Sequence, residues 1–316
     1  MDNNKKIPVI LDGDPGHDDA IAWVLASTIE EFDIKAITTV AGNQTIDKVT
    51  YNAQRIATLL KLNVEIAKGR EKPLMADLIT APNFHGESGL DGPILPEPNI
   101  KLSDLSAVEL MAKVIREADE KVIIITTGAK SNVAGLLLAH PELKEKIRLI
   151  STMGGGLRNG NWTAAAEFNI LVDPEAAHVV YNSGIPLQMC GLDVTEKALV
   201  YPSEWQKIRE LDNPIARIVA DWFDFFFIHV KSLGWDGATT HDPCAVMSIV
   251  HPEIFEIKDY YVQIDLDGKY TRGATIADYR GVLKQDENCR CVVDVDREKF
   301  VEYLYEACKK FEGWTL

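Results

Sequence analysis

The chain has 316 residues, 46% of them hydrophobic, so it can bury a substantial core as one large α/β domain or two smaller ones. Its 48 acidic residues outnumber 33 basic residues, and the net charge of −15 argues against nucleic acid as a partner and favours a neutral or cationic small molecule. The polar beginning of the chain and the lack of a long apolar stretch predict no membrane partner and a cytoplasmic location.

The cysteines fit the same compartment. They are odd in number and scattered, which is typical of reduced structural thiols rather than of a disulfide framework. The pair in Cys289-Arg290-Cys291 is also spaced too tightly for the usual zinc or redox motif. We therefore expect structural roles for Cys190, Cys244, Cys289, Cys291 and Cys308.

Strand-like and helix-like segments alternate along the first two thirds of the chain. Short apolar, β-branched runs predict strands at residues 8–11, 34–40, 64–67, 122–126, 147–153 and 187–190. Helical periodicity appears between most of them, at residues 20–26, 47–60, 107–118, 129–139 and 174–182. This alternation predicts an α/β fold with an open, mainly parallel, Rossmann-like sheet covered by helices on both faces.

The last third has a different pattern. A helix is predicted over residues 213–231, antiparallel strands and turns over 257–295, and a closing helix over 297–311. The antiparallel part is a small addition near the C-terminus. Because no linker, repeat or low-complexity run marks a boundary, we expect a single domain over residues 1–316.

The first predicted strand leads into an acidic segment that holds Asp12, Asp14, Asp18 and Asp19. Four like charges so close together repel one another unless a cation lies among them, and oxygen ligands suit calcium or magnesium. Asp14-Pro15-Gly16 forms the turn into a helix that Asp18 and Asp19 open, so all four carboxylates can face one point. For any one aspartate alone, a helix cap or a solvated strand end is an equally good interpretation.

Other polar loops follow later predicted strands, at residues 41–43, 127–128, 153–156 and 191–193. In a parallel sheet these loops meet the acidic segment at one edge, where ligands bind. Further along, Pro243 suits the first position of a helix, with Asp242 as its cap and His241 just outside. Such a histidine is usually structural, but together with the aspartate cluster it is a catalytic candidate.

Over essentially its whole length the sequence resembles the nucleoside hydrolases, the group of inosine-uridine preferring and ribosylpyrimidine nucleosidases. Residues 12–20 match the opening signature of that family. Further matches, in the family's order, lie at residues 42–45, 127–132, 153–156, 166–169, 173–177, 191–195 and 241–243.

The resemblance implies hydrolysis of the N-glycosidic bond of ribonucleosides to ribose and free base. Asp14 would be the general base on a calcium-bound water, and His241 would face the leaving base as an acid or hydrogen-bond donor. The calcium ligands would be Asp14, Asp19, Asp242 and the main-chain carbonyl of Thr127. The ribose hydroxyls would be held by Asp18, Asn43, Asn161, Glu167 and Asn169. Met153 and Phe168 would line the sugar. The family's habit also implies a homodimer or homotetramer.

The choice of base stays open between uridine, cytidine and inosine. His85 and His229 resemble polar contacts in pyrimidine-selective relatives, which slightly favours pyrimidine nucleosides. For His85 the alternative is a surface role, and for His229 a place in a partly exposed helix.

Two other functions compete with nucleoside hydrolysis. A magnesium phosphotransferase of the haloacid-dehalogenase kind also carries two aspartates two apart after its first strand, but Pro15 counts against it. A non-catalytic nucleoside-binding protein would keep the metal and sugar contacts, although it would have no use for Asp14 together with His241.

Overall fold

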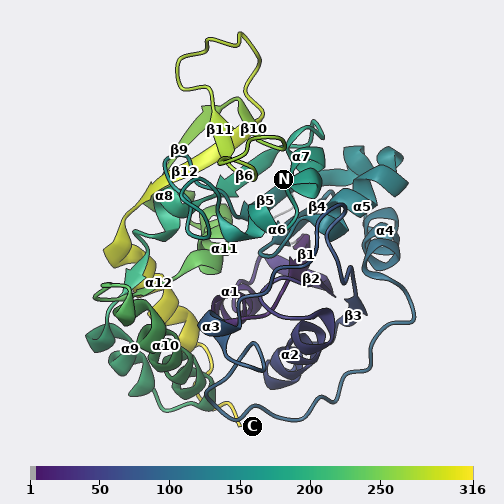
Figure 1. Ribbon diagram of the computed structural model, residues 1–316. Helices are drawn as coiled ribbons and strands as arrows, with labels where there is room; N and C mark the ends of the chain where they lie inside the picture. Colours follow the sequence, from purple (N-terminus) through teal and green to yellow (C-terminus); the bar gives the residue numbers. More distant parts are fainter. Residues whose placement is uncertain (1–4, 316) are drawn as a thin grey trace.

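The computed structural model describes residues 5–315, and its centre is an eight-stranded sheet (Figure 1). All neighbouring strands of this sheet are parallel except the last pair, β12 and β9. Across the sheet the order is β3 (Glu65–Lys68), β2 (Phe32–Thr39), β1 (Ile7–Gly13), β4 (Val122–Thr126), β5 (Ile147–Met153), β6 (Leu187–Cys190), β12 (Cys289–Val295) and β9 (Phe255–Tyr260). The predicted fold class is confirmed.

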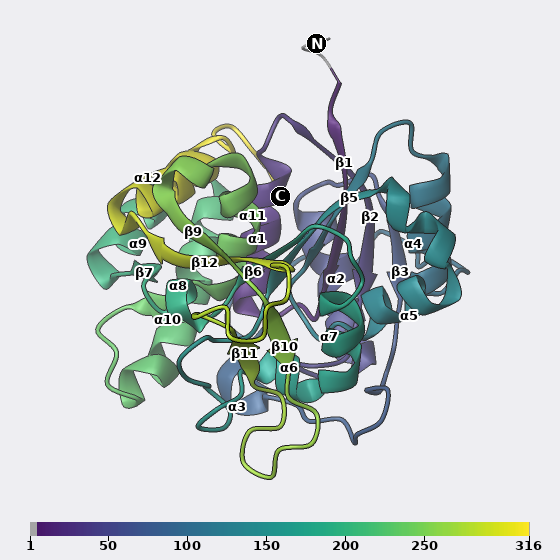
Figure 2. The same cartoon turned by 90° about the horizontal axis from the view of Figure 1, so that it is seen from above.

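Helices cover both faces of the sheet, and successive residues of β1 belong to different cores. Val9 and Leu11 lie in one core with residues of α1, α2, α10, α11 and α12, whereas Ile10 lies in a second core with residues of α4, α5 and α7. Figure 2 shows α1, α11 and α12 on one side of the sheet and α4, α5 and α7 on the other. These helices are α1 (His17–Ser27), α2 (Ile46–Leu59), α4 (Ala107–Glu117), α5 (Ser131–Ala139), α7 (Pro174–Tyr181), α10 (Pro214–Ser232), α11 (His241–Val250) and α12 (Arg297–Lys309).

Side-chain caps explain why several helices begin where the sequence predicts. Ser106 and Glu109 each accept a hydrogen bond from the other's main-chain N–H, which forms a capping box at the start of α4. Asn213 accepts from the N–H of Ala216 at 2.8 Å, and Pro214 opens α10. The helices expected over 107–118, 174–182, 213–231 and 297–311 are confirmed to within two residues at each end.

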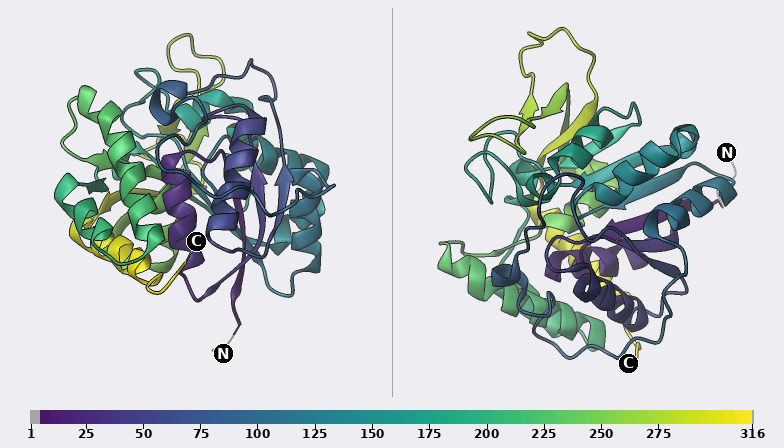
Figure 3. Two further views of the ribbon diagram at one scale, coloured as in Figure 1. Left: turned by 90° about the horizontal axis from the view of Figure 1, so that it is seen from below. Right: turned by 45° about the vertical axis from the view of Figure 1, so that its right-hand side comes forward.

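The C-terminal strands differ from the expectation in one respect. β9 and β12 are antiparallel, as are β10 (Val262–Ile264) and β11 (Thr275–Ala277), which stand at one end of the molecule (Figure 3). However, β12 also pairs in parallel with β6, where Cys291 lies opposite Met189. The antiparallel strands predicted over 257–295 are therefore confirmed, and the parallel pairing of β12 with β6, which was not anticipated, makes the tail an extension of the main sheet.

Shorter elements complete the described chain. They are α3 (Pro82–His85), α6 (Phe168–Val172), α8 (Leu192–Thr195), α9 (Pro202–Arg209), the 3-10 helices η1 (Pro141–Lys146) and η2 (Pro252–Ile254), and the paired strands β7 (Leu199–Val200) and β8 (Ala238–Thr239). Within residues 5–315, no helix combines the length and the apolar character needed to cross a membrane.

The strand order locates the functional edge of the sheet. From β1 the chain continues outward to β2 and β3, and then crosses to β4 on the other side of β1. In open parallel sheets ligands bind beyond the carboxyl ends of the strands at such a switch point. The acidic segment follows β1 and Thr127 follows β4, so both lie there.

Candidate active site

A cavity lies at this edge, among the loops that follow the parallel strands. Most of the residues expected at a nucleoside site line it: Asp18, Asn43, His85, Thr127, Met153, Asn161, Glu167, Phe168, Asn169, His241 and Asp242. Asp14 and Asp19 do not line the cavity, but each accepts a hydrogen bond from a residue that does. The main-chain N–H of Asn43 donates to Asp14 at 2.6 Å, and the hydroxyl of Thr127 donates to Asp19 at 2.6 Å.

Carboxylates from α1 and α11 meet at one side of the cavity. Oxygen atoms of Asp18, Asp19 and Asp242 all lie within 4.8 Å of one another. Oδ1 of Asp14 and Oδ1 of Asp18 are buried and have no hydrogen-bond partner among residues 5–315. A buried acceptor without a hydrogen-bond partner costs free energy, which indicates that a bound ligand supplies the missing interaction.

Burial and mutual repulsion raise the pKa values of this cluster. Burial raises the pKa of Asp18 to about 7, and the charge of Asp19 adds to the effect. The pKa of Asp14 is raised well above its usual range by burial and then by Asp19, and that of Asp242 by burial and then by Asp18. A cation placed among these groups would reverse the shift, because it favours the ionised carboxylates.

The donor set fits a hard divalent cation. The clustered ligand atoms are all carboxylate oxygens, which calcium and magnesium prefer, and Oδ1 of Asp14 and of Asp18 lack hydrogen-bond partners in the part of the chain that the structure describes. The cluster can therefore hold a metal ion. Asp18, expected among the ribose ligands, belongs geometrically to this cluster.

Asp12 lies apart from the other aspartates of the acidic segment. It is fully buried and accepts hydrogen bonds from Thr38 at 2.7 Å, Asn132 at 2.8 Å and Thr126 at 3.1 Å. The expectation that all four carboxylates face one point is therefore wrong for Asp12, and it is not a solvated strand end either. Its carboxylate joins β1, β2, β4 and α5 below the site.

The expected sugar-binding groups are held rigidly by main-chain hydrogen bonds. Glu167 caps α6 by accepting from the N–H groups of Asn169 and Ile170, and it also accepts from Gly155 at 2.9 Å. Asn169 donates to the carbonyl of Thr127 at 2.6 Å, so this expected metal ligand and an expected ribose ligand are in contact. Asn161 accepts from the N–H of Phe168 at 2.9 Å.

Another part of the wall is apolar and aromatic. Trp162 lies against Phe168 with ring centroids 4.7 Å apart. This apolar part is formed by Ala81, Phe84, Trp162, Phe168, Phe226, Val230, Leu233 and Trp235. Aromatic rings beside carboxylates and amides suit a ligand with a flat aromatic part and a hydroxylated part.

His241 enters the cavity from the start of α11. Its Nδ1 lies 2.8 Å from Oγ1 of Thr195, at the end of α8. Burial lowers its pKa to about 4, so the imidazole is neutral near pH 7. The helix begins at His241 with Thr240 as its N-cap residue, so Asp242 lies in the first turn and the expectation of Asp242 as the cap is wrong.

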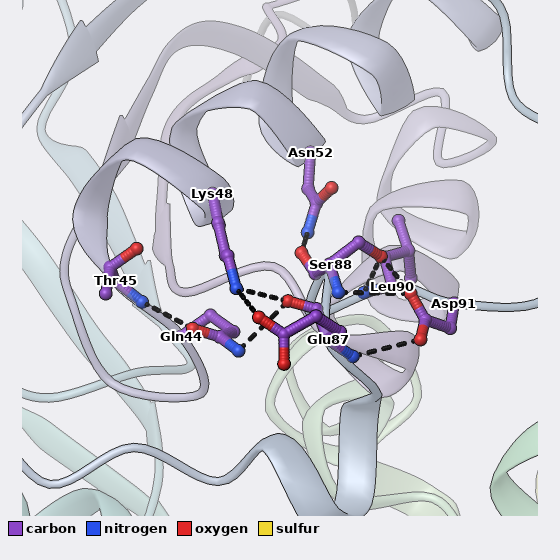
Figure 4. Close-up of polar contacts among 8 residues, drawn as sticks. All are labelled: Gln44, Thr45, Lys48, Asn52, Glu87, Ser88, Leu90 and Asp91. Atoms are coloured by element: carbon purple, nitrogen blue, oxygen red, sulfur yellow. Dashed lines mark hydrogen bonds and ion pairs between the residues drawn. The ribbon is translucent and has the colours of Figure 1, made fainter.

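His85 is held by His17, which is itself held by the main chain of Asp91. Its Nδ1 lies 3.1 Å from Nδ1 of His17, and Nε2 of His17 lies 2.8 Å from the carbonyl oxygen of Asp91. The loop after His85 is tied to α2, as Figure 4 shows. There Lys48 donates to the Glu87 carboxylate at 2.6 Å, and Asn52 donates to the carbonyl of Ser88 at 3.0 Å.

His229, like Asp14 and Asp19, does not line the cavity. Its ring packs on Phe84, with centroids 4.1 Å apart, and only Phe84 reaches the wall. His229 thus occupies a half-buried position of α10 behind Phe84, and its expected contact with the base stays a prediction. Conversely, Trp162, Glu196 and Thr239 line the cavity and were not anticipated. Glu196 and Thr239 lie close to the matched segments 191–195 and 241–243, whereas no motif marks Trp162.

Comparison with known proteins agrees with this geometry. The family model of the inosine-uridine preferring nucleoside hydrolases matches residues 9–302. The chain belongs to this family.

Relatives of this nucleoside hydrolase cover nearly its whole length. The pyrimidine-specific ribonucleoside hydrolase RihA of Enterobacter sp. (strain 638) is 49% identical over 96% of this chain and 98% of its own. RihA of Salmonella paratyphi B is 51% identical over 95% and 97%, respectively. The purine-preferring ribonucleoside hydrolase from Gardnerella vaginalis is 30% identical, with a TM-score of 0.91 over 98% of this chain and 100% of its own.

The protein is therefore an enzyme that hydrolyses the N-glycosidic bond of ribonucleosides. This result sets aside the phosphotransferase and the non-catalytic binding protein as interpretations.

Proposed function

We propose that this nucleoside hydrolase acts on pyrimidine ribonucleosides, uridine and cytidine, and that calcium is its metal. The observation that carries the proposal is the pair of buried, unpartnered oxygens on Asp14 and Asp18 beside an aromatic wall. Pyrimidine preference is supported by relatives about 50% identical that are named as pyrimidine-specific. Inosine remains a candidate substrate, because a neighbour with the same fold is named as purine-preferring.

Asp14, Asp19, Asp242 and the Thr127 carbonyl are the proposed calcium ligands, with Asp18 in the same cluster. Calcium held there would supply positive charge for polarising a water and for orienting two ribose hydroxyls. Asn43, Asn161, Glu167 and Asn169 donate to or accept from the ribose hydroxyls, and Met153 and Phe168 line the sugar ring.

The residues then divide the chemistry between them. Cleavage passes through an oxocarbenium-like state, which the surrounding carboxylates stabilise electrostatically. Asp14 accepts a proton from the attacking water through Oδ1, the oxygen that has no hydrogen-bond partner within the described chain. Neutral His241 donates a hydrogen bond from Nε2 to the departing base while its Nδ1 accepts from the Thr195 hydroxyl, and His85 contacts the base.

Ribose release from uridine, cytidine, inosine and adenosine tests the proposal. We expect the two pyrimidine nucleosides to be hydrolysed with the highest kcat/KM, no turnover after treatment with a chelator, and recovery when calcium is added back. Full activity of a metal-free preparation would contradict the metal assignment, and faster turnover of inosine or adenosine would contradict the base preference. Size-exclusion chromatography with light scattering tests the expected dimer or tetramer.

A further inference from the structure

One buried cation lies beside the acidic cluster and has no part in the mechanism above. Of the lysines and arginines among residues 5–315, only Lys130 is fully buried, with 0% of its surface exposed. It follows the loop after β4 and precedes α5. Burying an unpaired ammonium is costly, so a lysine at this place requires an explanation.

The hydrogen bonds of Lys130 join two loops of the site. Its Nζ donates to the carbonyl of Gly128 and, at 2.7 Å, to the carbonyl of Met153. The first carbonyl belongs to the loop after β4 and the second to the end of β5. Lys130 therefore holds together the loop that carries Thr127 and the strand end that carries Met153.

In space, a single residue, Gly128, separates Lys130 from Asp14, the proposed general base. Gly128, which accepts its hydrogen bond, packs so tightly on Asp14 that a Cβ atom there would lie 2.5 Å from Asp14 Oδ1. Burial lowers the pKa of Lys130, whereas the charges of Glu167, Asp14, Asp12 and Asp242 raise it. No carboxylate forms an ion pair with Nζ within 4.0 Å in the described chain, so the ammonium acts on all of them through space.

We infer that Lys130 is a positioning residue whose fixed charge offsets the buried carboxylates and thereby sets the affinity of the site for its metal ion. The inference rests on the proposed function, because it assumes a cation among Asp14, Asp18, Asp19 and Asp242. Lys130 makes the metal-free cluster less unstable, and it opposes a divalent ion that enters the cluster. Both effects favour the metal-free state, so both lower the affinity for the metal ion.

The test separates the charge of Lys130 from its hydrogen bonds. Lys130→Gln removes the charge and keeps N–H donors for the two carbonyl groups, whereas Lys130→Met removes both. Lys207→Gln, at an exposed position of α9, makes the same change in net charge away from the site. Calcium binding to each chelator-treated protein is measured by calorimetry, and the rise in Tm on adding calcium is a second readout that needs no turnover.

We expect Lys130→Gln to bind calcium at least about tenfold more tightly than the wild type, a difference of about 1.4 kcal/mol. We also expect its metal-free Tm to be lower and its calcium-induced rise in Tm to be larger, while Lys207→Gln changes neither. An unchanged or weaker calcium affinity of Lys130→Gln overturns the inference.

A methionine variant that binds calcium as tightly as the glutamine variant but has a higher KM assigns the KM effect to the lost hydrogen bonds. If the wild type itself binds no calcium, the metal assignment fails instead, and the two failures are thus distinguishable.

Discussion

Thr195 Oγ1, at the end of α8, lies 2.8 Å from Nδ1 of His241, the catalytic candidate at the start of α11. The contact directs the opposite ring nitrogen, Nε2, away from Thr195. A neutral imidazole held in this way is suited to donate a hydrogen bond to a leaving base.

Thr195→Val should therefore lower kcat for uridine by about tenfold, because loss of one orienting hydrogen bond weakens assistance to the leaving group. Thr195→Ser keeps a hydroxyl and should retain most of the activity. Hydrolysis of 4-nitrophenyl riboside, whose leaving group needs little assistance, should fall much less than hydrolysis of uridine. Equal losses for the two substrates would show that Thr195 supports the fold and not the leaving group.

Asp14→Asn tests the proposed general base. The amide cannot accept the proton of the attacking water, so kcat should fall by about 100-fold or more at saturating calcium, with nucleoside binding largely retained. Single-turnover rates and calorimetric binding of the nucleoside measure the two effects separately. Turnover at the wild-type rate would remove Asp14 from its proposed role.

The sequence predicts the helices and the parallel sheet well because their signals are local. The apolar run at residues 122–126 and the Ser106–Glu109 capping box each specify an element without distant partners. The pairing of β12 with β6 is different, since it joins residues about a hundred positions apart and depends on the whole sheet.

The same contrast holds at the site. The aspartates after β1 and the His241-Asp242 pair are recognisable because their spacing is a motif. The separate role of Asp12 depends on Thr38 and Asn132, which are 26 and 120 residues away in the chain. Lys130 looks like an ordinary surface lysine in the sequence, and only the packing of Gly128 against Asp14 places it beside the acidic cluster.

Calcium affinity should increase with pH between pH 6 and pH 8. The pKa of Asp18 is raised to about 7 in the metal-free protein, so below pH 7 a proton must leave before calcium binds. Below pH 7, each unit by which the pH is lowered should reduce the calcium affinity by up to about tenfold for each proton released on binding. Calorimetry at pH 6.5 in two buffers with different ionisation enthalpies counts these protons, and Asp18→Asn should release one fewer. A pH-independent affinity would mean that the carboxylates are already ionised without metal.

The free energy of unfolding should change with pH through Asp12 in the opposite direction from that expected for a carboxylate whose pKa folding lowers. Burial raises its pKa to about 6, despite three hydrogen bonds that lower it. A folded-state pKa above the unfolded value contributes stability that is fully present below about pH 4 and is lost as pH rises through 6. In a chelator, the wild type should thus lose free energy of unfolding between pH 5 and pH 7.5 through this group.

Asp12→Asn cannot ionise, and its amide can accept from Thr38 and Asn132 while donating to Thr126 Oγ1. Its free energy of unfolding relative to the wild type should therefore increase from pH 5 to pH 7.5, as measured by urea denaturation. Asp12→Ala serves as the matched control, because it cannot ionise either but leaves the three donors without an acceptor. It should be less stable than Asp12→Asn by about 3 kcal/mol at both pH values. A difference between Asp12→Asn and wild type that does not change with pH would show that Asp12 is ionised throughout, with its three donors outweighing the cost of burial.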